Sequence, residues 1–164
     1  MMGWRPLARA DLPALAAIAQ SVHPGYPERP EVFAERLALD PGGCFAFEAD
    51  RVMAGYALTH PWRGAPPKLD SLLGALPAAA DVQYIHDVAL LPPARGRGAA
   101  SQIVRRLDAA AQERGLRRLA LVAIDGRAPL WGCLGFVAAP APDGVSLASY
   151  DAGATYMIRP VGRP

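Results

Sequence analysis

A layered domain of the α/β or α+β class is the fold that this sequence predicts. Segments of helical and of strand periodicity alternate along the whole chain, which is typical of helices packed on a sheet. In the middle of the chain, a strand at 84–91, an amphipathic helix at 98–114 and a wholly apolar strand at 119–124 follow one another. A strand buried on both faces and reached through a helix indicates a right-handed parallel crossover.

The length and composition predict one globular domain. The chain has 164 residues, of which 52% are hydrophobic and 20% charged, so a single domain over 1–164 is expected. No apolar run approaches the roughly 20 residues of a membrane span. The first residues lack an apolar signal-peptide core, and Cys44 and Cys133 match neither a disulfide framework nor a metal knuckle. We therefore expect a cytoplasmic protein with no metal and no membrane partner.

The charge balance gives no reason to expect a nucleic-acid partner. The formal net charge is only +2, and the cationic residues do not form a run. A small-molecule ligand is the simpler expectation.

The first third of the chain predicts a strand, two helices and a hairpin. Asp11 precedes apolar residues at helical spacing and is expected to cap that helix. The segment 23–27 contains two prolines and a glycine and ends it. The elements expected are a strand at 4–8, helices at 12–22 and 31–39, and strands at 44–48 and 51–59.

A long connection rich in proline and glycine separates this hairpin from the strand at 84–91. Residues 60–82 form it, with a helical turn expected at 69–76. Long connections between firm elements are often functional, so this one is a candidate wall of the site. Beyond residue 124, the pattern predicts a short helix at 127–134 and strands at 136–139 and 155–159.

The helix at 98–114 begins at a glycine turn that suits an anion. Its apolar residues form one stripe of period 3.6, and Gly96 and Gly98 allow a ligand to approach the backbone closely. The free N–H groups of a helix start, with Arg95 and Arg97 nearby, match a pyrophosphate. The turn lacks the third glycine of a dinucleotide site and the Gly-Lys-Ser/Thr of a P-loop. A tight turn without a ligand is the alternative.

The segment Arg95-Gly96-Arg97-Gly98-Ala99-Ala100 resembles the acetyl-coenzyme A motif of the GCN5-related N-acetyltransferase (GNAT) superfamily. The stretches 122–136 and 154–159 are similar to later blocks of that family and come in the same order. The resemblance implies the GNAT fold, a central mixed sheet of about six to seven strands with helices on both faces. It also implies that the parallel strands 84–91 and 119–124 splay apart, and that a homodimer is common.

The resemblance implies acetyl-coenzyme A (acetyl-CoA) as co-substrate and assigns residues to it. The backbone of the 88–90 strand would pair with the pantetheine arm, and the glycine turn would hold the pyrophosphate. The cofactor residues implied are Val88, Ala89, Leu90, Arg95, Gly96, Arg97, Gly98, Ala99, Ala100 and Ser101, with Asp125 and Trp131 from the later block.

His86 and Asp87 are the candidate catalytic bases. The acceptor amine must lose a proton, and some family members carry Glu-Asp where this chain has His-Asp. Strict strand alternation would place the two side chains on opposite faces, whereas a bulge, common in this family, would bring both to the cleft. The alternative is that His86 is a structural histidine and Asp87 tethers a loop.

The general acid is where the chain departs from the family. Trp131 stands where many members have a tyrosine, and an indole N–H is not a useful acid. Tyr84, Tyr150, Tyr156 or water are the alternatives. For the acceptor pocket, Tyr26, His60 and Trp62 are the candidates, from the 23–30 loop and the end of the hairpin.

These residues predict an N-acetyltransferase that moves an acetyl group from acetyl-CoA to a primary amine, that of a small molecule. Cys133 is interpreted as a structural thiol, so direct transfer in a ternary complex is expected rather than a ping-pong route. A protein N-terminus or lysine is the other acceptor considered. The rivals are a catalytically idle acyl-CoA-binding module and a nucleotide-binding regulator.

Overall fold

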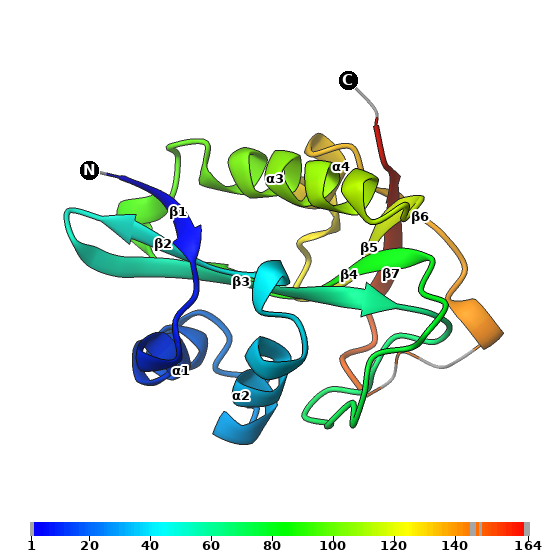
Figure 1. Ribbon diagram of the computed structural model, residues 1–164, viewed down its shortest axis with the longest axis horizontal. Coiled ribbons are helices and arrows are strands. Elements are labelled where there is room, and N and C mark those ends of the chain that lie inside the picture. The colour runs from blue at the N-terminus through cyan, green and yellow to red at the C-terminus, as the bar shows by residue number, and fades with distance from the viewer. Residues whose placement is uncertain (1, 145–146, 148, 163–164) are drawn as a thin grey trace.

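A seven-stranded mixed sheet runs through the centre of the molecule (Figure 1). The computed structural model describes residues 2–144, 147 and 149–162. The strand order is β1-β2-β3-β4-β5-β7-β6, in which β4 and β5 are parallel and the other neighbours antiparallel. The strands are β1 (Met2–Pro6), β2 (Cys44–Ala49), β3 (Val52–Trp62), β4 (Val82–Leu90), β5 (Arg118–Ala123), β6 (Val137–Ala138) and β7 (Thr155–Pro160).

Helices cover both faces of this sheet (Figure 1). On one face lie α1 (Leu12–Val22) and α2 (Pro30–Leu39), and on the other α3 (Ala99–Glu113) and α4 (Ala128–Cys133). The predicted layered fold, with its parallel pair at the centre, is thus confirmed.

The apolar stripe of α3 forms the larger core. Ile103 and Leu107 are fully buried, and they belong to one cluster with Leu119 and Leu121 of β5. On the opposite face, Leu15 of α1 lies in a second cluster with residues of β2, β3 and α2. Burial of each such side chain favours folding by about 1.5–3 kcal/mol, so both helical layers are held to the sheet by apolar contact.

The parallel pairing of β4 with β5 stops partway along both strands. It runs from Val82 opposite Arg118 to Ile85 opposite Leu121, although β4 continues to Leu90. Residues 87–90 keep their pairing with β3 on the other side. The strands therefore separate as the family resemblance implied, and one edge of β4 is left open.

A β-bulge in β4 coincides with the point of separation. Leu58 of β3 lies opposite Asp87, and the next residue, Thr59, lies opposite Ile85. His86 is the extra residue, so the alternation of side chains is broken between His86 and Asp87. The bulge considered from the sequence is present.

Two local predictions were wrong. Residues 69–76 contain no helical turn, and their backbone polar groups bind side chains of α2 and of the loop before it instead. Asp11 precedes α1 but does not cap it with its side chain. Its carboxylate instead accepts from the Ala8 N–H at 2.8 Å and pairs with Arg5, which fixes the turn before the helix.

Gly55 tests how closely β3 and β4 approach beside the open edge. A Cβ at Gly55 would lie 2.7 Å from Cδ2 of Leu90 and 2.8 Å from the carbonyl oxygen of Ala89. We expect Gly55→Ala to lower the free energy of unfolding by about 1–3 kcal/mol, measured by urea denaturation, because backbone must move to make room. Gly3→Ala is the matched control in β1, since nothing lies within 4 Å of its added Cβ. Equal stability of both variants would contradict this packing.

Candidate active site

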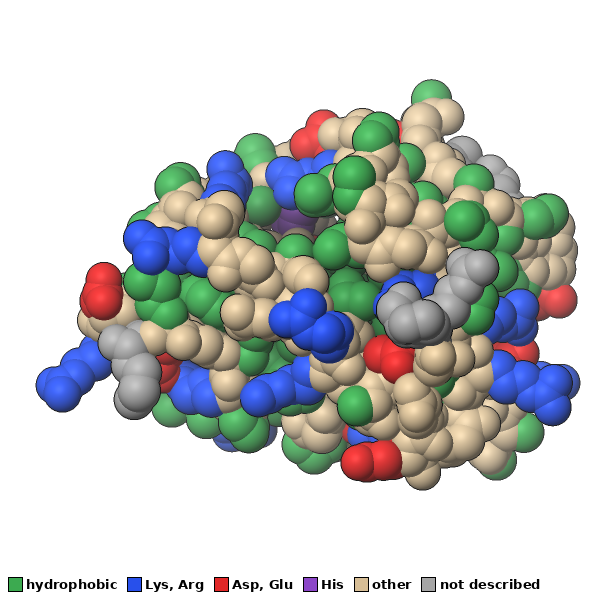
Figure 2. Space-filling view, turned by 90° about the horizontal axis from the view of Figure 1, so that it is seen from above, with side chains coloured by type: hydrophobic (Ala, Val, Ile, Leu, Met, Phe, Trp, Pro, Cys, Tyr) green, Lys and Arg blue, Asp and Glu red, His purple; other side chains and the backbone are tan. Residues whose placement is uncertain are grey.

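A cavity of about 470 Å³ opens where β4 and β5 separate. Figure 2, which looks from the side of α3 and α4, shows a histidine at the bottom of a hollow on that face. Its walls come from the glycine turn, the unpaired half of β4, the end of β5, helix α4 and three loops. Its lining residues are His23, Tyr26, Glu28, Leu69, Ile85, His86, Asp87, Val88, Leu90, Ala94, Arg95, Gly96, Gly98, Ala99, Ala100, Ser101, Leu121, Val122, Ile124, Arg127, Leu130, Trp131, Leu134 and Tyr150.

One end of the cavity is formed by the glycine turn and the first residues of α3. Gly96 and Gly98 have positive φ angles of 69° and 74°, and Gly98 is the N-cap of the helix. Within the described residues, none of the backbone N–H groups from Gly96 to Ser101 donates a hydrogen bond. Trp4 Nε1–H donates to the Ala99 carbonyl at 2.8 Å and fixes the helix start.

This end therefore fits a phosphate-bearing ligand. Free N–H groups at a helix start, added to the positive end of the helix dipole, attract an anion. A Cβ at Gly96 would meet nothing within 4 Å, so the space above the turn is free for a ligand. Arg95 lines the cavity and also donates to the Leu90 carbonyl at 2.9 Å, which ties the turn to β4.

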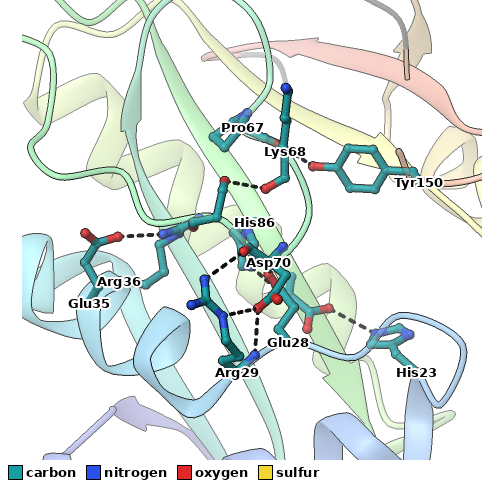
Figure 3. A network of polar contacts seen from close by, with 12 residues as sticks. His23, Glu28, Arg29, Glu35, Arg36, Pro67, Lys68, Asp70, His86 and Tyr150 are labelled. Carbon is teal, nitrogen blue, oxygen red and sulfur yellow. Dashed lines mark hydrogen bonds and ion pairs between the residues drawn. The ribbon is translucent and has the colours of Figure 1, made fainter. Parts of the chain in front are cut away.

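The other end of the cavity holds a buried Glu28–His86 pair. His86 Nε2 lies 2.8 Å from Glu28 Oε1, and the two side chains are only 3% and 5% exposed (Figure 3). The remaining ring nitrogen, Nδ1, has no hydrogen-bond partner among the residues that the structure describes. If the neutral ring donates Nε2–H to the carboxylate, Nδ1 carries the lone pair that can accept a proton.

Asp87 is surrounded by donors. The Tyr56 hydroxyl donates to Oδ2, and His23 Nε2 lies 3.0 Å from Oδ1. Burial alone would raise the pKa of Asp87, but His23 and Tyr56 outweigh it and hold this pKa below its usual value. Burial likewise works against charge on His23, and Asp87 again prevails, so the pKa of His23 is raised. Asp87 thus holds a charge and is a poor proton acceptor.

The loop between β3 and β4 is fastened over this end by its backbone (Figure 3). Glu35 accepts from the N–H groups of Leu73 and Gly74 at 2.7 and 2.9 Å. Glu28 accepts from the Asp70 N–H at 3.1 Å, and buried Arg36 donates to the Ser71 carbonyl at 3.1 Å. Leu69 of this loop therefore reaches the cavity, and the loop forms a wall as expected.

Aromatic residues complete the walls. Trp131 packs edge-on against Phe136 with ring centroids 5.4 Å apart, which fixes its ring in the cavity. The Tyr26 hydroxyl donates to Asp151, and this bond raises the pKa of Tyr26 to about 12. The Tyr150 hydroxyl donates to the Pro67 carbonyl.

Several predicted residues lie outside the lining. His60 is fully buried between Trp62 and Tyr84, and burial lowers its pKa to about 4. Trp62 donates Nε1–H to the Ala65 carbonyl at 2.8 Å. Neither reaches the cavity, so the structure does not support them as acceptor contacts. Arg97 and Asp125 are exposed and also absent from the lining, as is Ala89, which packs into the core.

Sequence reasoning missed the partners of the two candidate bases. Glu28 was not singled out, His23 was interpreted only as part of a helix break, and Tyr56 only as a strand residue. The one available signal was the position of His23 and Glu28 in the 23–30 loop, which was expected to border the acceptor.

The described residues hold no group of three or more His, Cys, Asp or Glu side chains able to bind a metal ion. No helix in that part of the chain is both long and apolar enough to cross a bilayer. Cys44 and Cys133 are free thiols, the first buried and the second exposed.

One family model matches most of the chain, and solved structures share its fold. The model of the acetyltransferase (GNAT) family matches residues 10–136, whereas no curated protein sequence matches the chain. Among solved structures, N-acetylglutamate synthase from Neisseria gonorrhoeae, complexed with coenzyme A and N-acetyl-glutamate, is similar with a TM-score of 0.74 at 18% identity. That match covers 99% of this chain but only 36% of the synthase.

Two further solved structures are similar over nearly their whole length. The ribosomal-protein-S18-alanine N-acetyltransferase from Escherichia coli has a TM-score of 0.67 at 22% identity, covering 100% of this chain and 96% of its own. A GNAT-like decarboxylase, GphF, in complex with isobutyryl-CoA has a TM-score of 0.76 at 15% identity. That match covers 96% of this chain and 98% of the decarboxylase. At these identities the likeness shows the fold alone.

The hydrogen bond from Tyr56 to Asp87 can be tested through acid stability. We expect Tyr56→Phe to lower the free energy of unfolding at pH 7 by about 1–3 kcal/mol, since Asp87 loses a buried donor. The stabilisation from a depressed carboxyl pKa is present above the unfolded value of about 3.9 and is lost as pH falls through the folded value. Because the variant raises that folded pKa, acid should destabilise it at a higher pH than wild type, in urea denaturation from pH 7 to pH 3.

Tyr84→Phe is the matched control, because Tyr84 is equally buried and has no carboxylate partner in the described part of the chain. The same acid midpoint in both variants would contradict the assigned role of Tyr56.

Proposed function

This chain belongs to the acetyltransferase (GNAT) family, and we propose that it transfers an acetyl group from acetyl-CoA to the primary amine of a small molecule. One observation carries the proposal. Within the described residues, one cavity joins a run of free backbone N–H groups at one end to a buried histidine with an unpartnered nitrogen at the other. The first end suits a diphosphate, and the second suits proton transfer.

The residues present fit coenzyme A. The N–H groups from Gly96 to Ser101 would hold the pyrophosphate, and the open edge of β4 at Val88 and Leu90 would take the amide groups of the pantetheine arm. Trp131 supplies an apolar surface beside that edge. The solved structures that resemble this chain include coenzyme A complexes, which supports the same ligand class here. Bound acetyl-CoA supplies the acetyl thioester.

His86 is proposed as the general base. Glu28 holds the ring through Nε2 and leaves Nδ1 to accept the proton of the attacking amine, directly or through one water. The backbone N–H groups on the open edge of β4 are the donors available to a developing oxyanion. Asp87, the other candidate base, is assigned instead to holding His23, because its carboxylate is committed to His23 and Tyr56.

A small acceptor is supported by the walls at the histidine end. Tyr26, Leu69 and Tyr150 border the cavity there, and the loop that carries Leu69 is fastened by Glu28, Glu35 and Arg36. A protein N-terminus or lysine is the competing acceptor, and an amine screen decides between them. No cysteine lines the cavity, and burial raises the pKa of Cys44 to about 12, which supports direct transfer over a thiol intermediate.

The idle acyl-CoA-binding module is the rival function. The loss of the usual tyrosine at Trp131 favours it, whereas the buried Glu28–His86 pair favours catalysis, because His86 Nδ1 is left without a partner in the described residues. A cytoplasmic location and a homodimer remain predictions.

Gly98 tests the phosphate site. We expect Gly98→Val to lower acetyl-CoA affinity at least tenfold by isothermal titration calorimetry, because valine at a φ of 74° distorts the turn that presents the N–H groups. Gly115→Val is the matched control, with a φ of 70° beyond the other end of α3 and nothing within 4 Å of the added Cβ. Unchanged affinity in the Gly98 variant, or equal losses in both, would remove the phosphate-turn argument.

His86 tests the base. With an amine found by screening for free-thiol release, we expect His86→Gln to lower kcat about 10²-fold or more while acetyl-CoA affinity stays unchanged. Wild-type turnover in the variant would exclude His86 as the base. Absence of thiol release with every small amine, but release with peptides, would move the acceptor to proteins.

A further inference from the structure

We propose that His23, charged and held against Asp87, is the general acid that protonates the departing thiolate. The inference rests on the proposed acetyl transfer and supplies the group that the family pattern lacks at Trp131. It concerns the second of two carboxylate–histidine pairs in one cavity, Glu28–His86 and Asp87–His23.

The position of His23 leaves one ring nitrogen for a ligand. His23 follows α1 directly and lines the cavity together with His86 and Trp131. Its side chain is 8% exposed, and neither ring nitrogen makes an aligned hydrogen bond within the described residues. Nε2 is the nitrogen that lies 3.0 Å from Asp87 Oδ1, so Nδ1–H of the charged ring is the donor that remains. A buried donor without a partner points to a ligand group that completes it.

The charges around His23 favour its protonated form. Asp87 of β4 is the anion in contact with it, and Tyr56 of β3 and His86 favour the charged form of that carboxylate. Arg127, at the N-cap of α4, opposes charge on His23, and a contact of the ring with the Val88 backbone, too poorly aligned to be a hydrogen bond, favours that charge. The balance raises the pKa of His23, whereas a general base requires the neutral ring.

The tyrosines are less suited to this role. Tyr84 is fully buried outside the cavity lining, and burial raises its pKa well above the usual value. Tyr150 lines the cavity, but its hydroxyl donates a hydrogen bond to the Pro67 carbonyl, and burial raises its pKa as well. Tyr156 is absent from the lining.

The proton transfers balance. A C–N bond forms between the amine and the acetyl carbon, and the amine proton passes to His86. The C–S bond breaks, its electron pair stays on sulfur, and the His23 Nδ1–H proton moves to that sulfur. The products are an amide and a free thiol. His86 then carries the extra proton and His23 lacks one, and exchange with solvent restores both.

The experiment compares a titration with a rate profile. The chain has three histidines, so each ring can be assigned by ¹⁵N NMR with single variants. We expect wild-type kcat/KM to fall at alkaline pH with the same pKa that His23 shows by NMR in the free protein, because kcat/KM reports ionisation of the free enzyme. Asp87→Asn should lower the pKa seen in kcat/KM and the pKa of His23 seen by NMR by the same amount.

In the variant His23→Gln, kcat/KM should no longer fall at alkaline pH (the alkaline limb of the pH profile), and kcat should drop about 10²-fold or more. Its acetyl-CoA affinity should be retained. Two controls accompany it. His60→Gln removes a buried histidine outside the cavity, and Tyr150→Phe removes the competing hydroxyl; both should keep the alkaline limb.

Three results would overturn the assignment. In the first, the pKa of the alkaline fall in wild-type kcat/KM differs from the pKa of His23 measured by NMR. In the second, His23→Gln still shows that alkaline fall. In the third, His23→Gln loses the fall at acidic pH instead, which would make His23 a base. The wild-type comparison needs no variant to fold. Failure of the proposed function is distinct, since wild type would then release no thiol with any amine, whatever the pKa of His23.

Discussion

The site depends on two parallel strands that stop pairing while both continue. Beyond Ile85 and Leu121, β3 is the one strand of the described chain that still pairs with β4, so the other edge of β4 has backbone groups to offer a ligand. In most sheets such an edge is a liability that is covered. Here the sheet is packed on both faces around the gap, because α3 contacts β4 and β5 on one side while α1 contacts β3 and β4 on the other.

Charge is concentrated at the end of the cavity that holds His86 and Asp87. Glu28, Asp87, His23 and His86 are all largely buried, and each carboxylate is compensated by at least one donor. A buried charge without such partners would cost several kcal/mol, so removing any member disturbs the others. The bulge at His86 is what brings both pairs to the same cavity, since regular alternation would have turned one away.

Local pattern was sufficient for the fold and for locating the glycine turn, but not for the contacts of the two histidines. The stripe of α3 and the apolar strand β5 are periodic features, and the glycine turn is a contiguous motif, so each could be recognised in the sequence. The contacts of His86 with Glu28 and of Asp87 with His23 join residues about 60 positions apart, and no short pattern predicts them. His60 was a candidate for the acceptor pocket because it is a polar residue near a strand end. In the structure it is buried between two aromatic rings, and no local pattern indicates that burial.

The loop between β3 and β4 is attached mainly through its own main chain, and the Asp70 carboxylate adds a side-chain contact with Arg29. Glu28, Glu35 and Arg36 bind the amides of Asp70, Leu73 and Gly74 and the carbonyl of Ser71, and these groups are the same for nearly every amino acid. Side chains such as Leu69 can therefore change without releasing the loop. That separation of anchoring from contact makes this segment the natural place to diversify when the ligand preference of the cavity is to be changed by laboratory evolution.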